Sequence, residues 1–189
     1  MKRLKDIIII ILLLYIPCLT AQAQKVAMGT NCLEWGNFGT VNLETGFAVS
    51  QHISISAGAR YNPWEFKTDN PHLAVQNKQQ TFFTGVRYWP WYVFSGWWIE
   101  GKIQYSNFTR SGVWRPAVEI GKGVGAGISA GYTLLLTHHL NIEFGAGIWG
   151  GRLLERTLYD CPLCLNVRES GAENFARIDN ISVSLFYIF

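Results

Sequence analysis

The chain has 189 residues, which suits one domain, and it contains 14% aromatic residues, 15% charged residues and 19 glycines. Aromatic residues and glycine are both more frequent than in an ordinary soluble domain. The formal net charge of +3 comes largely from the first residues, so it gives no reason to expect a nucleic-acid partner. We find no linker, low-complexity tract or internal repeat that would divide the chain.

The N-terminus has the pattern of a secretory signal peptide. Lys2, Arg3 and Lys5 precede an apolar run over residues 7–16, and the small-residue triplet Ala21–Ala23 follows. The run has about ten residues, whereas a helix that spans a membrane needs about 20. A permanent N-terminal anchor is therefore the weaker interpretation.

We expect cleavage after Ala23, which separates a signal peptide over residues 1–23 from a mature domain over residues 24–189. The mature domain keeps 13 basic and 12 acidic residues and is close to neutral. Lipoprotein processing at Cys18 is the alternative. A proline directly before that cysteine argues against it, because such sites usually contain small residues there.

Alternation of apolar and polar side chains with a period of two predicts β-strands along the whole mature domain. In the first predicted strand Val26, Met28 and Cys32 form the apolar face. In the last one the apolar face ends on Tyr187 and Phe189, the C-terminal signature expected to be read by the barrel-assembly machinery. The predicted strands lie near residues 26–33, 41–47, 53–61, 79–88, 97–106, 124–134, 140–148 and 180–189.

The connections between these strands alternate between short and long. Tight or compact turns are expected near residues 50–51, 90–95 and 137–138, and longer loops near residues 34–39, 62–78, 107–122 and 150–175. Outer-membrane barrels have short periplasmic turns, long extracellular loops and an even number of strands. The pattern therefore predicts an all-β, eight-stranded, antiparallel up-and-down transmembrane barrel in the outer membrane of a Gram-negative bacterium.

An exported soluble barrel of the lipocalin type is the alternative, because alternation alone does not tell the inner face from the outer face. The polar face decides in favour of the membrane barrel. It is rich in glycine and serine and carries isolated charges, which suits the filling of a narrow lumen.

Six charged residues share this polar face and are predicted to point into the lumen. Unpaired charges would be costly in so narrow an interior, so we expect them to pair with one another. A structural polar core is favoured over a proton or ion path. The residues of this predicted network are Glu44, Arg60, Arg87, Glu100, Lys102 and Glu143.

A cluster of aromatic residues brackets the predicted compact turn near residues 90–95. Amphipathic rings favour the headgroup level of a bilayer, so we expect these side chains on the outside of the barrel at its periplasmic end. The cluster consists of Trp89, Trp91, Tyr92, Phe94, Trp97 and Trp98.

The residues offer little catalytic chemistry. Cys161 and Cys164 form a Cys-x-x-Cys pair in the longest predicted loop, where a small-loop disulfide is favoured over free thiols or a metal site that would lack two ligands. His52 and Ser54 form the one pattern similar to a barrel lipid hydrolase, whose serine needs an adjacent base. We predict no cofactor and no metal, and an outer-membrane lipid-modifying enzyme is the alternative function.

Several short motifs are distributed along the mature domain: Thr30-Asn31, Gly58-Ala59-Arg60-Tyr61-Asn62-Pro63-Trp64, Arg87-Tyr88-Trp89, Gly125-Ala126-Gly127-Ile128-Ser129-Ala130-Gly131-Tyr132 and Tyr159-Asp160-Cys161-Pro162-Leu163-Cys164. They resemble a domain-of-unknown-function family of small outer-membrane β-barrels from Gram-negative anaerobes of gut and mouth. The resemblance covers nearly all of the mature domain. Gly29 is a departure, since a lysine often stands there in the family.

The resemblance implies an eight-stranded barrel without an assigned activity, and some members of the family are associated with fimbrial systems. We therefore expect a non-enzymatic structural or surface-interaction role through the extracellular loops, with outer-membrane lipid and a surface or fimbrial protein as partners. A monomer is expected.

Overall fold

The computed structural model describes residues 26–37, 39–66, 75–111, 117–160 and 167–189, and the expected signal peptide lies outside them. The described residues form strands and one short helix. In chain order these are β1 (Val26–Asn31), α2 (Cys32–Gly36), β2 (Val41–Ala48), β3 (Ile53–Asn62), β4 (Glu65–Phe66), β5 (Val75–Tyr88), β6 (Gly96–Ser111), β7 (Val118–Leu135), β8 (Leu140–Tyr159) and β9 (Val167–Ile188).

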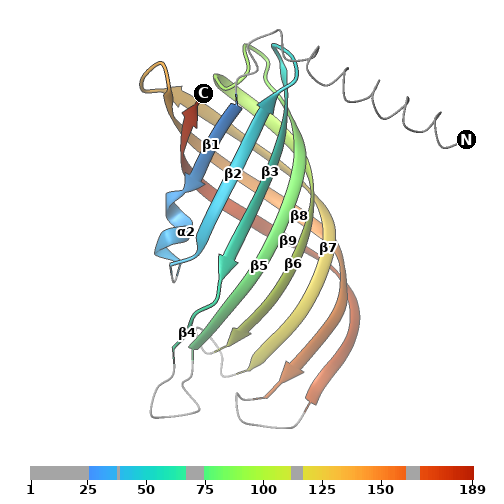
Figure 1. Ribbon diagram of the computed structural model, residues 1–189. Helices are drawn as coiled ribbons and strands as arrows, with labels where there is room; N and C mark the ends of the chain where they lie inside the picture. Colours follow the sequence, from blue (N-terminus) through green and yellow to red (C-terminus); the bar gives the residue numbers. More distant parts are fainter. Residues whose placement is uncertain (1–25, 38, 67–74, 112–116, 161–166) are drawn as a thin grey trace, which may run out of the picture.

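Eight of the described strands form one closed antiparallel barrel (Figure 1). The ring closes where β1 pairs with β9, and β3 pairs directly with β5. The two-residue strand β4 adds to the edge of β5 and is not one of the eight. The predicted eight-stranded antiparallel barrel is therefore confirmed. No helix in the described part of the chain has the length and hydropathy needed to cross a membrane.

The two ends of the barrel differ in their connections. The turns at residues 49–52, 89–95 and 136–139 lie at one end, which we call the turn end and which is uppermost in Figure 1. Backbone hydrogen bonds close the first and third turns, from Val49 N to Ile53 O (2.9 Å) and from Leu136 N to Leu140 O (2.9 Å). We call the opposite end, where the longer connections and α2 lie, the loop end.

The strands extend further toward the loop end than the alternation pattern predicts. β8 continues to Tyr159 and β9 begins at Val167, so most of the predicted loop over residues 150–175 is strand. β6 and β7 likewise extend into the predicted loop over residues 107–122. The apolar alternation is lost there, but backbone pairing with the neighbouring strand continues, and that pairing does not depend on an apolar face.

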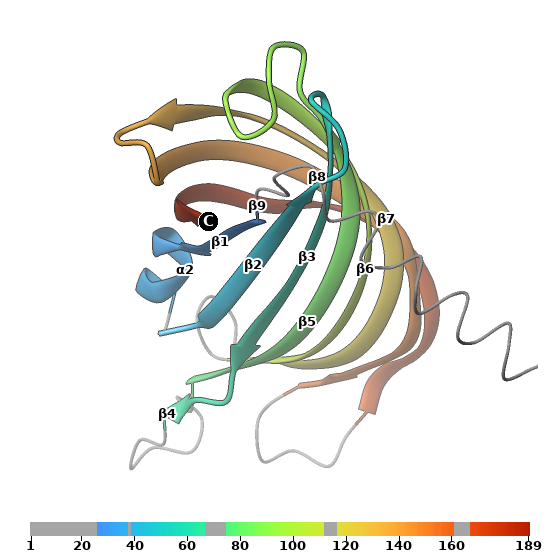
Figure 2. The same cartoon turned by 45° about the horizontal axis from the view of Figure 1, so that its top comes forward.

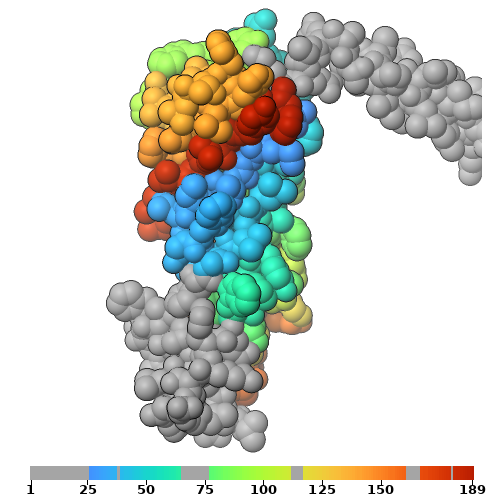
Figure 3. All heavy atoms as spheres, turned by 60° about the vertical axis from the view of Figure 1, so that its left-hand side comes forward, coloured from blue at the N-terminus to red at the C-terminus, as the bar shows by residue number. Residues whose placement is uncertain are grey.

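The first strand is shorter than predicted. It ends at Asn31, whose side-chain oxygen accepts hydrogen bonds from Leu33 N (3.1 Å) and Val183 N (3.2 Å). The first bond caps the N-terminus of α2, and the second ties this corner to β9. Cys32 therefore begins a helix, and its predicted place on the outer face of a strand is wrong. In Figure 3, β1 and α2 (blue) lie against β9 (red) on one face of the molecule, and β2 follows on the other side of β1.

Apolar side chains cover the outside of the barrel, as the alternation predicts. Ile55, Ile103, Ile128 and Ile181 are between 44% and 65% exposed, although they belong to four different strands. The residues that alternate with them point inward and are mostly buried. This arrangement inverts that of a soluble globular domain, in which the large apolar side chains are inside.

The described apolar core fills the barrel at the turn end. The connection over residues 89–95 folds back across this opening (Figure 2), and its Trp89 and Phe94 rings pack at 5.8 Å between centroids. The Asn141 amide donates to the carbonyl oxygen of Phe94 (2.8 Å) and holds this residue at a φ of 61°, which is unusual for a bulky side chain. The buried cluster consists of Ala27, Trp89, Val93, Phe94, Trp98, Phe186 and Ile188.

The aromatic cluster predicted on the outside is therefore divided. Trp91, Tyr92 and Trp97 are exposed, but Trp89, Phe94 and Trp98 are inside. The prediction is wrong for the last three because successive residues of β6 face opposite sides, which puts Trp98 on the same side as Glu100, and because the turn before β6 enters the lumen.

Candidate functional site: the filled lumen

The structure places the side chains of all six charged residues predicted for the lumen inside the barrel. Arg87, Glu100 and Glu143 are at most 6% exposed, and Arg60 and Lys102 are also buried. The Glu44 side chain is 21% exposed. The residues separate into two groups of ion pairs, stacked between the apolar core at the turn end and the loop end.

The first group is the Arg87 cluster, which consists of Arg87, Glu44, Glu100 and Glu143. The Arg87 guanidinium bonds Glu143 (Nη1 to Oε1, 3.0 Å) and Glu100 (Nη2 to Oε2, 3.5 Å), and it also bonds Glu44. Its face covers the Trp98 ring, with 4.3 Å between Cζ and the ring centroid. One arginine thus forms ion pairs with three carboxylates, which come from three different strands, β2, β6 and β8.

Hydroxyl groups supply further donors to these carboxylates. Thr133 donates to Glu143 (3.1 Å), and Ser56 donates to Glu100. A buried carboxylate is stabilised by several donors at once, so the serine and threonine residues of the inner face have an electrostatic role as well as a small volume.

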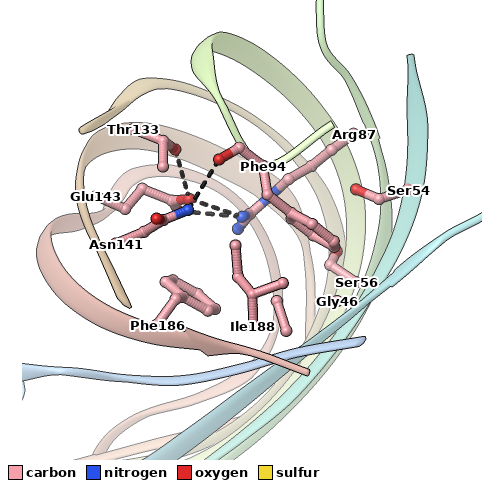
Figure 4. A pocket seen from close by; sticks show the side chains of 11 residues that line it. Gly46, Ser54, Ser56, Arg87, Phe94, Thr133, Asn141, Glu143, Phe186 and Ile188 are labelled. Carbon is pink, nitrogen blue, oxygen red and sulfur yellow. Dashed lines mark hydrogen bonds and ion pairs between the residues drawn. The ribbon is translucent and has the colours of Figure 1, made fainter. Parts of the chain in front are cut away.

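Little space remains around the Arg87 cluster. The cavity in Figure 4 lies between the cluster and the apolar core, and its volume is about 10 Å³. A second cavity beside Ser129 and Glu100 has the same volume. A cavity needs about 10–15 Å³ to hold one water molecule. The described lumen is therefore filled with side chains at this level, as expected for eight strands.

The second group is the Asp179 cluster, which consists of Asp179, Glu34, Arg60 and Lys102. Arg60 bonds Glu34 (Nε to Oε1, 2.9 Å) and Asp179 (Nη1 to Oδ1, 3.4 Å), and Lys102 also bonds Asp179. Both cations lie over the ring of Phe83, at 5.1 and 5.2 Å from its centroid. Burial raises the pKa of the Glu34 carboxyl, and Arg60 opposes that effect.

The sequence pattern missed both acids of the Asp179 cluster. Glu34 was expected in a loop, but α2 directs it toward Arg60. Asp179 lies next to an irregularity in the β8–β9 pairing, where Ala146 pairs with Ile181 and Ile148 pairs with Ile178. The extra residue in β9 shifts the alternation, so that Asp179 faces inward while Ile178 faces outward. The sequence did contain a signal of this shift: Ile178 and Ile181 are three positions apart, whereas strict alternation separates outward residues by an even number of positions.

The other residues singled out in the sequence are not brought together as a catalytic site. Trp89 lies between His52 and Ser54: its carbonyl oxygen is 3.0 Å from His52 Nδ1, and its indole donates to Ser54 Oγ (2.9 Å). Cys161 and Cys164 lie outside the described residues. No group of three or more His, Cys, Asp and Glu side chains in the described ranges is arranged to hold a metal ion.

The C-terminal aromatic residues lie on the outside at the turn end. Tyr187 and Phe189 are exposed and pack edge to face at 4.9 Å between centroids, and the His139 ring stacks on Tyr187 at 5.7 Å. The Phe189 amide donates to the Val26 carbonyl (2.8 Å), which joins the two ends of the barrel sheet.

Comparison with known proteins gives one match. The model of a family described as "Protein of unknown function (DUF3575)" matches residues 8–189. Neither the search of curated proteins nor the search of solved structures found a match.

Proposed function

We propose that this chain, which belongs to the DUF3575 family of proteins of unknown function, is a monomeric outer-membrane β-barrel. In this proposal residues 1–23 are a cleaved signal peptide, and the barrel is inserted by the barrel-assembly machinery. The protein has a structural or surface-interaction role through its loop end, without catalysis and without transport through the lumen.

The apolar outer face is the observation that carries the proposal. On β6 it runs from Trp97 to Tyr105, which is nine residues and close to the 9–11 that a tilted strand needs to cross a bilayer. Polar residues follow on the loop side, where Gln80, Asn107 and Lys122 stand next to one another on β5, β6 and β7. So large an apolar surface is unfavourable in water and suits a hydrocarbon environment.

The filled lumen supports a role other than transport. The apolar core closes the turn end, and the two ion-pair clusters fill the lumen between it and the loop end. The cavities between these layers have volumes of about 10 Å³, too small for a continuous path of water.

In this proposal the loop end is the surface that meets a partner. β7, β8 and β9 continue beyond the apolar belt, and their inner and rim charges pair with one another. Arg156 bonds Glu119 (3.1 Å) and Glu173 (2.6 Å), and Arg177 also bonds Glu119 (3.3 Å). These bonds stiffen a wall that stands in the external medium. We propose a surface protein as the partner, and a fimbrial subunit is the first to test.

Cell fractionation and electrophoresis test the membrane proposal. We expect the protein in the outer-membrane fraction, with an N-terminus at Gln24, and a mobility in SDS that changes only after boiling because a closed barrel offers no free strand edge. A protein that stays soluble and monomeric in buffer without detergent would contradict the proposal. A lipid on Cys18 would contradict cleavage after Ala23 but not the barrel.

A further inference from the structure

A cavity of about 290 Å³ opens on the barrel wall just beyond the apolar belt, on the side of the loop end. Its walls are the end of β3 (Tyr61, with Asn62 and Pro63), residues 78–80 of β5 and residues 107–109 of β6. It is far larger than the lumen cavities and is separate from both ion-pair clusters.

Pro63 explains why the wall opens here. The β3–β5 pairing ends at Asn62 and Gln79, and pairing resumes only between Glu65 and Gln76. Proline has no N–H group to donate to a neighbouring strand, so the chain leaves β5 at this point. The Asn62 side chain accepts a hydrogen bond from Trp64 N (3.1 Å) and holds the chain in its displaced course.

The lining combines a flat ring with neutral amides. Tyr61 pairs with Gln80, and Gln80 pairs with Asn107, so these three outward side chains form one row across three strands. Tyr61 is 47% exposed, and the buried residue Phe108 is among those that line the cavity. Within the described residues, the amides of Gln80 and Asn107 bond no other protein group. Each therefore offers both donors and an acceptor to a ligand.

We propose that this cavity binds a carbohydrate. Adjacent sugar hydroxyls are both donors and acceptors, which matches the amides of Gln80 and Asn107, and the C–H face of a sugar ring packs on an aromatic ring such as Tyr61. An anionic ligand fits less well, because Lys78 is the one charged residue among those that line the cavity, and it already interacts with another group. A purely apolar ligand would leave the amides unpaired.

The position of the cavity suggests two sources for the sugar. It lies at the first polar row beyond the apolar belt, which is the headgroup level if the proposed membrane insertion holds. The saccharide of a glycolipid in the same membrane would reach it from the side, and a free glycan would reach it from the medium. The choice between these sources rests on the proposed function, whereas the sugar site itself does not.

Calorimetric titration of the full-length mature protein in detergent tests the site. The probes are lipopolysaccharide in mixed micelles and the soluble oligosaccharide released from it. The variants are Tyr61→Ala and the double variant Gln80→Ala with Asn107→Ala. Asn174→Ala is the matched control, because Asn174 is an exposed asparagine on β9 and does not line the cavity. A mobility change on boiling verifies that each variant is folded.

We expect the oligosaccharide to bind, and both cavity variants to weaken it at least about tenfold while Asn174→Ala binds like the wild type. Tighter binding of lipopolysaccharide than of the oligosaccharide, with the same loss in the variants, identifies the membrane glycolipid as the source. Equal binding of the two probes identifies a free glycan.

Two results would overturn the sugar site: no binding of the oligosaccharide, or equal binding of it by the wild type and by all variants. Binding of lipopolysaccharide without binding of the oligosaccharide would mean that the acyl chains are bound elsewhere on the belt. The protein could be absent from the outer membrane and still bind the oligosaccharide through these residues. That result would contradict the proposed function and support the sugar site.

Discussion

Arg87 is the residue on which the electrostatics of the lumen depend. It is 6% exposed and bonds three carboxylates, so its removal leaves the buried Glu100 and Glu143 and the partly exposed Glu44 without their shared cation. The cost of leaving a buried charge without its partner is about 3–5 kcal/mol, far more than the value of an exposed ion pair. The cluster therefore stabilises the fold only as a complete unit.

We predict that Arg87→Ala lowers the free energy of unfolding by about 3–5 kcal/mol, measured by urea titration of the folded barrel in lipid vesicles. Glu143→Ala combined with Arg87→Ala should cost less than the sum of the single changes, because the two groups are in direct contact. Coupling with Glu143 at 3.0 Å should exceed coupling with Glu100 at 3.5 Å, although Glu100 is the cross-strand neighbour of Arg87.

Lys122→Ala with Glu155→Ala is the control, since this ion pair lies on the exposed rim of the barrel. We expect no measurable change in unfolding from it. Additive effects of Arg87→Ala and Glu143→Ala would contradict the description of the Arg87 cluster as one coupled unit.

Gly58 is a second residue whose identity follows from the lumen. A Cβ atom there would collide with Cζ of Phe83 and lie 2.7 Å from its Cε1 atom. Phe83 cannot move away easily, because Arg60 and Lys102 both pack on its ring.

We predict that Gly58→Ala destabilises the barrel by about 1–3 kcal/mol through overpacking, measured by the same urea titration. Gly101→Ala is the matched control: a Cβ atom at Gly101 meets nothing within 4 Å. Equal stability of the two variants would show that the inner face has more room than the lumen geometry allows.

At the scale of elements, the connection between β5 and β6 acts as a plug for the turn end. Trp97 and Trp98 are sequence neighbours, yet Trp97 is 58% exposed and Trp98 is 3% exposed. Trp98 packs against Trp89 at 6.4 Å between centroids, inside the barrel. The two tryptophans therefore report on opposite sides of the same strand.

We predict that brominated lipids quench the fluorescence of Trp97 but not that of Trp98. In vesicles of brominated lipid, Trp97→Phe should remove part of the fluorescence that the lipid quenches. Trp98→Phe should remove only fluorescence that the lipid does not quench. Loss of quenchable signal in Trp98→Phe would contradict the inward position of that ring.

At the scale of the whole molecule, the sheet closes into a ring, and side chains fill the lumen that the ring surrounds. From the turn end, the apolar core comes first, the Arg87 cluster second and the Asp179 cluster third. Each layer takes residues from several strands, so each one also holds the ring together.

We predict that planar-bilayer recordings of the intact protein show no steady ion conductance. The lumen cavities of about 10 Å³ leave no continuous water path, and the charges in them are engaged in ion pairs. Steady single-channel currents would contradict the filled lumen and require a pore as the function.

The sequence alone was sufficient for the number of strands, their order and most of their outward faces, although it placed Cys32 and Trp98 on the outside wrongly. A strand exposes alternate residues to opposite sides, so the pattern is local and can be read without knowing the neighbours. The inward position of Arg87, Glu100 and Glu143 follows from the same alternation. The short and long connections likewise gave the two ends of the barrel.

Only the tertiary structure decided which charges meet and how far the strands extend. Arg87 gathers three acids because β2, β6 and β8 curve around it, and no spacing within one strand contains that information. Asp179 reaches Arg60 and Lys102 through an irregularity in the β8–β9 pairing, which shifts the alternation by one residue. The reason is the same in both cases: alternation is a property of one strand, whereas register, bulges and lumen contacts belong to the closed ring.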